Sequence, residues 1–178
     1  MTQPERVPQA GGIALPAGVG EGEFKMAMRQ VACSVAVITA RSGAQVNGLT
    51  ATAVCTVSAS PPVLLVCVNK RASAEAIIAA SGSFAVNFLT AEQHRVARLF
   101  STARLDPEER FAEGLWQAQV TGAPVLDGAL ANFDCVVENR ISSGSHNIYL
   151  GRVVAAVSLD QEGLIYRDGS FRRLAPVA

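Results

Sequence analysis

Short apolar runs separated by Gly, Pro, Asn, Asp and Ser residues recur along most of this chain. Runs of this length that are rich in β-branched residues predict buried or half-buried strands. Pro61-Pro62 interrupts the pattern, because proline cannot donate to a sheet ladder. The expected strands cover residues 34–39, 45–58 (as one long strand or a bulged pair), 63–68, 84–89, 116–120, 128–139, 146–158 and 163–166.

Helical periodicity is confined to a few short segments. An amphipathic pattern predicts a helix over residues 22–32, and further helices are expected over 72–80 and 91–100. Thr90 is expected to cap the last of these, and Ser81-Gly82 is expected to end the one before it.

The remaining segments bear on the domain organisation. Residues 1–20 are rich in Gly, Pro and Ala without periodicity and are expected to form a mobile N-terminal arm, which leaves residues 21–178 as a single domain. Residues 101–114, with the acidic run Asp106–Glu109, are expected to be irregular. Because strands dominate and do not alternate with helices as in a doubly wound sheet, the pattern favours a mainly β antiparallel barrel with a few short accessory helices.

The composition indicates a domain with a large core and a sparsely charged surface. Of the 178 residues, 49% are hydrophobic and 17% are charged, which favours further burial in an oligomer or an apolar ligand cleft. Fifteen basic residues offset fifteen acidic ones, so no binding of nucleic acid is expected.

The chain is expected to be cytoplasmic and without membrane contact. No segment reaches the roughly 18–20 consecutive apolar residues of a membrane span, and the first residues do not resemble a signal peptide. The four cysteines form no C-x-x-C pair and are expected to be reduced thiols in the core. Because the chain has only two histidines, His94 and His146, no metal site is expected.

Residues 48–69 are the most informative stretch, opening with small and hydroxyl-bearing residues and continuing as an apolar run. Thr50, Thr52, Thr56 and Ser58 share one parity and would line one face of a strand. Such a row of hydroxyls must meet solvent, another polar layer or a ligand. This pattern alone is compatible with either a solvated sheet face or a binding surface.

The following turn, Asn69-Lys70-Arg71-Ala72-Ser73, favours the binding surface. It places two cations and a hydroxyl just before a predicted helix, where backbone N–H groups and the helix dipole favour a phosphate. Together, the strand and the helix start can hold a planar, phosphate-bearing ligand such as a flavin. The chain shows no Ser/His/Asp constellation and no glycine-rich phosphate loop.

These segments resemble the short-chain flavin reductases, the small reductase components of two-component aromatic monooxygenases. The resemblance covers roughly residues 24–175. Reductases that serve phenol, chlorophenol or hydroxyphenylacetate oxygenases are most similar, and the pyrimidine-degrading branch is also similar. The matching motifs are residues 48–58 with Pro61-Pro62, 84–89, Arg110-Phe111, 122–126, 129–135, 144–151 and 166–174.

This resemblance implies a split-barrel, Greek-key fold that works as a homodimer. It also implies that NADH reduces free FAD, or FMN, and that the reduced flavin passes to a separate oxygenase component. The aromatic-monooxygenase relatives favour FAD, whereas the choice between NADH and NADPH stays open. In such a reaction the flavin carries the chemistry, and the fold holds nicotinamide C4 about 3–3.5 Å from flavin N5.

The site residues follow from the same resemblance. His146 is expected to stand by the nicotinamide and to orient it, or to stabilise charge on the flavin, rather than to transfer a proton. Residues 50–52 would contact the flavin ring, 56 and 57 its linker, and 69–73 its phosphates. The expected cofactor-binding residues, besides His146, are Thr50, Ala51, Thr52, Thr56, Val57, Asn69, Lys70, Arg71, Ser73 and Phe171.

The chain departs from the family pattern at three positions. Thr52 stands where many relatives have Asn, Ser145 where many have Asp, and Arg172 where many have His. The first departure bears on hydrogen bonding to the ring edge, and the other two bear on the contacts with NADH.

Three alternatives compete with a reductase of free flavin. The first is a split-barrel flavoprotein that keeps its FMN and acts directly on a small molecule. The second is a non-catalytic module that binds flavin or haem, and the third is an interaction barrel whose hydroxyl strand is only surface. Fold alone does not separate them, because one fold can carry several functions.

Overall fold

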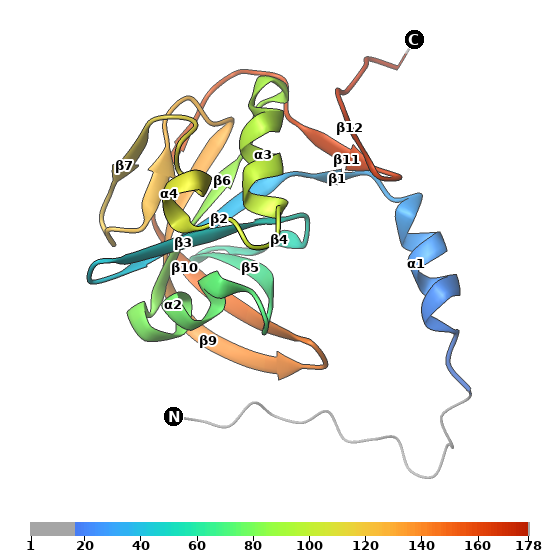
Figure 1. Cartoon of the computed structure of the whole chain (residues 1–178), viewed down its shortest axis with the longest axis horizontal. Helices are drawn as coiled ribbons and strands as arrows, with labels where there is room; N and C mark the ends of the chain where they lie inside the picture. The colour runs from blue at the N-terminus through green and yellow to red at the C-terminus, as the bar shows by residue number, and fades with distance from the viewer. Residues whose placement is uncertain (1–16, 178) are drawn as a thin grey trace.

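A computed structural model describes residues 17–177 of the chain and contains a curled, antiparallel, seven-stranded sheet (Figure 1). The predicted antiparallel barrel with short accessory helices is confirmed. The order of the strands is β3-β2-β6-β9-β10-β5-β4. Their bounds are β2 Ala36–Ser42, β3 Gln45–Ala51, β4 Val54–Ala59, β5 Pro62–Asn69, β6 Ser83–Phe88, β9 Ala131–Ser143 and β10 His146–Ser158.

The sheet closes incompletely between β3 and β4. These strands follow each other in sequence but lie at opposite ends of the strand order. Between them, the carbonyl of Ala53 accepts a hydrogen bond from the N–H of Cys67 in β5, at 3.0 Å. The connection at residues 52 and 53 therefore carries the chain from one edge of the barrel to the other.

The predicted row of hydroxyls on one strand face is wrong, whereas the bulged pair of strands over residues 45–58 is confirmed. The strand breaks at Thr52-Ala53, and a register shift between Thr56 and Ser58 leaves Val57 in a bulge. Strand parity does not carry across a break or a bulge, so the hydroxyls on the two sides are directed independently.

Two small sheets flank the barrel. The sequence pattern did not predict β8 and β12, which are short and end in or next to turns. One sheet joins β1 (Cys33–Ser34), β11 (Ile165–Arg167) and β12 (Ser170–Arg172), and the other joins β7 (Trp116–Ala118) and β8 (Pro124–Leu126).

The three predicted helices are present, with bounds shifted by a few residues. They are α1 (Glu21–Arg29), α2 (Ser73–Ser81) and a 3-10 turn, η1 (Ala91–Gln93), that leads into α3 (His94–Ser101). Thr90 is the N-cap residue of η1 and forms a capping box with Gln93, in which the N–H of Thr90 donates to the Gln93 side chain at 3.0 Å. Gly82 ends α2 with a φ of 66°, a left-handed conformation that glycine adopts at little cost.

The prediction that residues 101–114 are wholly irregular is wrong. Pro107–Arg110 form the short helix α4. Asp106 and Glu109 cap its start, and the N–H of Asp106 donates to the Glu109 carboxylate at 3.0 Å. Asp-Pro-x-Glu is a local helix-start signal that the acidic composition of the run obscured.

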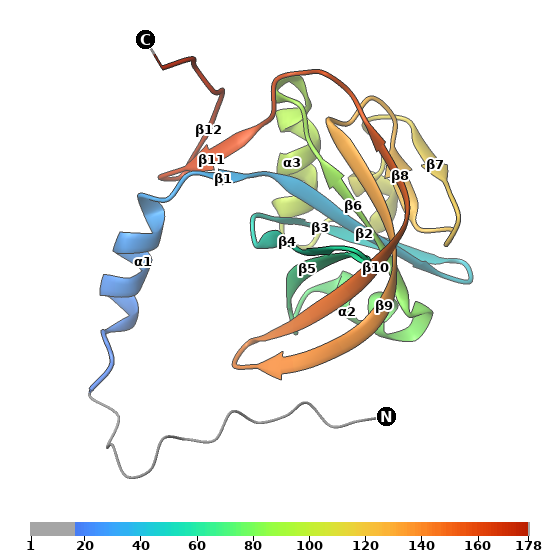
Figure 2. The same ribbon diagram turned by 180° about the vertical axis from the view of Figure 1, so that it is seen from behind.

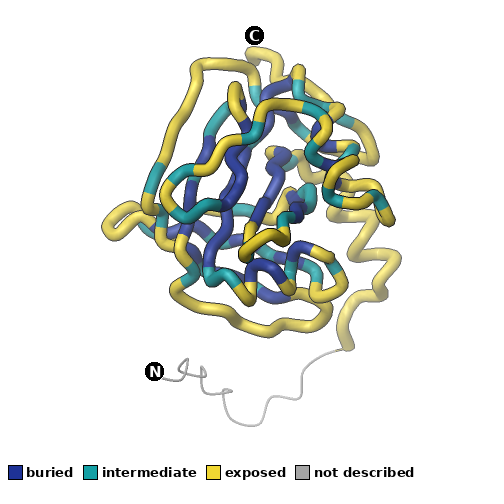
Figure 3. Tube along the Cα trace, turned by 60° about the vertical axis from the view of Figure 1, so that its left-hand side comes forward, coloured by how far each residue is buried: buried dark blue, intermediate teal, exposed yellow. Residues whose placement is uncertain are grey.

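The core has two parts. One fills the barrel and includes Ile38, Phe84 and Tyr149 together with Ile78 of α2, and the other lies between β2 and α3. Figure 3 shows the buried stretches gathered in the middle of the molecule, with exposed stretches around them. Helix α2 therefore covers one side of the barrel interior, and α3 covers the outer face of β2.

Helix α1 stands away from the barrel (Figure 2). None of its residues is buried, and Phe24, Met26 and Met28 are 58%, 63% and 47% exposed. The predicted amphipathic helix is thus formed, and its apolar side chains are only partly covered within residues 17–177, where Phe24 and Met28 line a cavity with Tyr166 of β11. Most of the predicted N-terminal arm, residues 1–16, lies outside the described residues. No helix of the described chain is long and apolar enough to span a membrane.

Candidate functional site

Four predicted site residues line one cavity of about 730 Å³, here called the α2 cavity. They are Thr50 near the end of β3, Asn69 at the end of β5, and Arg71 and Ser73 at the start of α2. The remaining lining residues are Asn47, Gly48, Leu49, Ala72, Arg110 and residues 100–106.

The turn between β5 and α2 is shaped by Asn69. Its side-chain oxygen accepts a hydrogen bond from the N–H of Arg71 at 2.9 Å, and its carbonyl accepts one from Ala72 at 2.9 Å. Ala72 is the N-cap residue of α2 and makes no side-chain cap bond. First-turn N–H groups of α2 therefore remain available to an anion, next to the exposed Arg71 and Ser73.

The β3 side of the cavity is packed closely against α3. The hydroxyl of Thr50 donates to the carbonyl of Ala97 at 2.7 Å, which leaves its oxygen free to accept a bond from a ligand. Gly48 has no room for a side chain, because a Cβ would lie 2.6 Å from the Phe100 ring and 2.8 Å from the carbonyl of Ile38. The small and hydroxyl residues of β3 thus let the helix approach the strand.

His146 lies beside the cavity rather than in its wall. It starts β10 and pairs with Asn69 of β5 in the strand register. The side chain is exposed, and its Nδ1 lies 2.9 Å from the hydroxyl of Ser145. Lys70 is fixed to the same β9–β10 turn, since its Nζ donates to the carbonyl of Gly144 at 2.7 Å.

The structure does not bring the other predicted residues into the α2 cavity. Thr52 and Thr56 line a second cavity of about 310 Å³ with Cys55, Phe88 and other residues. Ala51 is buried, and Val57 is exposed in its bulge.

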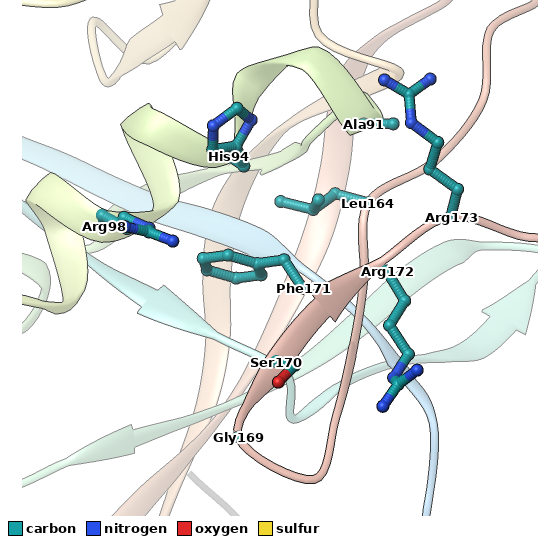
Figure 4. Close-up of a pocket in the computed structure, with 9 residues that line it drawn as sticks. All are labelled: Ala91, His94, Arg98, Leu164, Gly169, Ser170, Phe171, Arg172 and Arg173. Carbon is teal, nitrogen blue, oxygen red and sulfur yellow. The ribbon is translucent and has the colours of Figure 1, made fainter.

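Phe171 lines a separate cavity of about 680 Å³ between α3 and the β11–β12 hairpin. Figure 4 shows its ring directed toward α3, near Arg98, whereas Arg172 points away from the helix. The ring also packs edge-on against Tyr166, with centroids 5.6 Å apart. Phe171 and the α2 cavity are therefore on different parts of the surface of α3.

A partly buried carboxylate connects α2 to β10. Glu75, in the first turn of α2, accepts hydrogen bonds from Asn147 at 2.6 Å and from the hydroxyl of Tyr149 at 2.7 Å. Arg140 approaches the same oxygen at 3.8 Å. Burial, and next the hydrogen bond to Glu75, raise the pKa of Tyr149 above its ordinary value.

Sequence reasoning missed Glu75 as well as Arg110 and the 100–106 segment of the cavity wall. Arg110 belongs to a motif shared with the family, but the segment around it was predicted to be irregular. The capping pair at Asp106 and Glu109 was the local signal that could have revealed order there. In the described part of the chain, no group of three or more His, Cys, Asp or Glu side chains could hold a metal ion.

Comparison with known proteins gives the family. Residues 28–175 match the profile described as a flavin reductase like domain. A relative from Ancylobacter novellus, "FMN reductase (NADH) RutF", is 38% identical over 165 residues, which cover 92% of this chain and 91% of that protein.

Solved structures of flavin reductases have the same fold. BorF, the flavin reductase component of a bacterial two-component tryptophan halogenase, is 33% identical with a TM-score of 0.80, over 89% of this chain and 100% of that chain. The NADH:FAD oxidoreductase SgcE6 of Streptomyces globisporus is 31% identical with a TM-score of 0.81, over 93% of this chain and 99% of that chain. The predicted family, mainly β split-barrel fold and enzyme class are confirmed: the chain belongs to the flavin reductase-like family and is a flavin oxidoreductase.

Proposed function

We propose that this protein transfers a hydride from NADH to a free flavin held in the α2 cavity and then releases the reduced flavin to a separate oxygenase. The observation that carries this proposal is the meeting of Thr50, Asn69, Arg71 and Ser73 around one cavity, in a chain of this family. The names of RutF and SgcE6 support NADH as the hydride donor.

The start of α2 is the proposed phosphate site. Arg71 supplies a guanidinium that can bind two phosphate oxygens, and Ser73 adds a hydroxyl. The uncapped helix N-terminus adds N–H groups and a favourable dipole. These groups are exposed, which suits a ligand that must leave after each turnover.

The flavin ring is proposed to lie toward β3, where Thr50 can bond to its polar edge. Lys70 remains a predicted phosphate contact, and Ala51, Thr52, Thr56, Val57 and Phe171 remain predicted contacts with the flavin or with NADH. FAD is our preferred flavin, although relatives are named for both FMN and FAD. Flavin and NADH supply the redox chemistry when bound, so the chain need only bind, orient and shield them.

His146 is the proposed orienting residue for the nicotinamide. Its place beside Asn69 puts the imidazole next to a residue of the α2 cavity, and the Ser145 hydroxyl can fix its ring. A neutral imidazole can donate to or accept from a carboxamide without transferring a proton. Replacing His146 by Ala should therefore raise the KM for NADH while leaving flavin affinity unchanged.

A second copy of the chain is the proposed cover for helix α1. Phe24, Met26 and Met28 are too exposed for a helix held only by its own domain. A homodimer that buries this face fits the apolar composition.

A cytoplasmic location fits the four free cysteines. The oxygenase partner is proposed to act on an aromatic compound, from the resemblance of the sequence.

Oxidation of NADH, followed at 340 nm with and without added FAD or FMN, tests the function. Activity that rises from near zero as flavin is titrated supports the proposal and identifies the better flavin. Oxidation without added flavin would instead indicate a retained FMN. Flavin binding without NADH oxidation would favour a non-catalytic binding module.

A further inference from the structure

Arg110 carries a buried positive charge at the wall of the α2 cavity. The residue is 7% exposed and lines the cavity. Within residues 17–177 its guanidinium forms no ion pair with a carboxylate. It donates instead to backbone carbonyls at 2.9–3.2 Å, those of Leu99, Phe100, Thr102 and Leu105.

These carbonyls belong to the end of α3 and the segment that follows it. The last carbonyls of a helix lack partners within the helix and carry partial negative charge. Helix α3 ends at Ser101, and the C-cap residue that follows it is Thr102 rather than a glycine. Thr102 bonds to the carbonyl of Arg98 through its N–H and its hydroxyl, and Arg110 adds donors to the next two carbonyls, those of Leu99 and Phe100. A guanidinium suits this role because its donors are held in a rigid fork.

The Arg110 side chain links the two ends of the segment 99–110 through these hydrogen bonds. Arg110 is the last residue of α4, which Asp106 and Glu109 cap at its other end. Residues 102–106, between α3 and α4, have no regular secondary structure, yet all five line the cavity. Their position as a wall thus depends on the bonds from Arg110 to the carbonyls on either side.

We infer that Arg110 is a positioning residue for flavin binding: it fixes residues 100–106 as a wall of the cavity and does not itself bind the phosphate. This inference rests on the proposed function. Four of the five N–H donors of the guanidinium are directed to carbonyls, which leaves one for any ligand. Arg71, exposed at the start of α2, is the contrasting case, a cation free to meet the phosphate.

Riboflavin and FMN separate these two roles, because riboflavin lacks the phosphate. Flavin affinity is measured by the change in flavin fluorescence on binding, for the wild type, Arg110→Lys and Arg71→Gln. Lysine keeps the charge but is a point donor that cannot span four carbonyls. Arg110→Lys should weaken riboflavin and FMN by the same factor, about tenfold, whereas Arg71→Gln should weaken FMN alone.

Kinetics and stability give further readouts. For Arg110→Lys, the KM for flavin should rise by a similar factor, while kcat at saturating flavin stays within about twofold. Val96→Ala, in the buried face of α3 away from the cavity, is the matched control. It should lower the melting temperature without changing flavin affinity.

If Arg110→Lys does not fold, Glu109→Ala tests the same segment from its exposed side. Glu109 does not line the cavity, and its carboxylate only caps α4. Its loss should weaken riboflavin and FMN equally, by a smaller factor.

Several outcomes would overturn the inference. Loss of FMN binding with riboflavin binding intact would make Arg110 a phosphate ligand. Unchanged affinity for both flavins, or an equal loss in Val96→Ala, would reduce its role to stability. A wild-type protein that binds flavin but does not oxidise NADH would refute the proposed function and leave the role of Arg110 testable by affinity.

Discussion

Replacing Glu75 by Gln is expected to lower the free energy of unfolding and to loosen the link between α2 and β10. The side chain is 15% exposed and accepts from both Asn147 and Tyr149 through one oxygen. Glutamine keeps the shape and a neutral acceptor but removes the charge. The variant therefore isolates the charge-assisted part of the two hydrogen bonds.

The expected loss in the free energy of unfolding comes from the two hydrogen bonds to Glu75 and from its partly screened ion pair with Arg140. Hydrogen bonds to charged groups contribute about 1.5–3 kcal/mol, against about 1 for neutral ones, so each bond weakens by about 1 kcal/mol. The pair with Arg140 spans 3.8 Å and that side chain is 52% exposed, so it adds little. The expected loss is about 2 kcal/mol, or about 4–8 °C in melting temperature for a chain of this size.

Urea unfolding at pH 7, followed by circular dichroism, measures this loss. Tyr149→Phe and the double variant complete a double-mutant cycle, whose expected coupling is about 1 kcal/mol. Arg140→Gln is the control and should cost less than about 1 kcal/mol. A loss below about 0.5 kcal/mol for Glu75→Gln, or additive effects in the cycle, would refute the stabilising role of these bonds.

Three further predictions concern other parts of the fold. Gly151→Ala should cost about 1–3 kcal/mol by thermal unfolding, because its Cβ would overlap the Phe84 ring and lie 3.0 Å from the Cβ of Cys135. Burial raises the pKa of Cys135 from 9.0 to about 12, so between these pH values mainly the thiol of the unfolded chain ionises. The free energy of unfolding should therefore fall by about 2–3 kcal/mol by pH 11. Urea titrations of Cys135→Ala should show a shallower decline with pH. Thr50→Val should raise the KM for flavin and cost about 1 kcal/mol, since it removes the bond to Ala97; an unchanged KM would exclude Thr50 from the site.

The strands were predictable because their signal is local. Alternating or continuous apolar runs bounded by turn residues located β5, β6 and β10 to within one or two residues. The break at Thr52-Ala53 was not predictable in the same way. It depends on β3 pairing with β2 while β4 pairs with β5, and strand partners distant in sequence leave no mark on the residues between them.

The candidate site was predictable in part for the same reason. The Asn69–Ser73 turn is a local feature, and it lines the α2 cavity as its composition suggested. Arg110 was noted only as part of a family motif, and its bonding role was not predictable because it depends on carbonyl groups, which every residue carries. Only the folded chain shows which carbonyls end a helix beside a buried guanidinium.

The α2 cavity lies between β3 and the end of β5, two strands that are not neighbours in the sheet, and this location explains what holds its walls. Thr50 and Asn69 are at the ends of strands on either side of the β3–β4 connection, so ladder hydrogen bonds do not fix one against the other. Glu75 ties the α2 wall to β10, and Arg110 ties the wall formed by residues 100–106 to the end of α3. Under the proposed function, a cavity braced in this way by side chains would hold a flavin in a defined place and still release it, which a closed barrel interior packed with Phe84 and Tyr149 could not do.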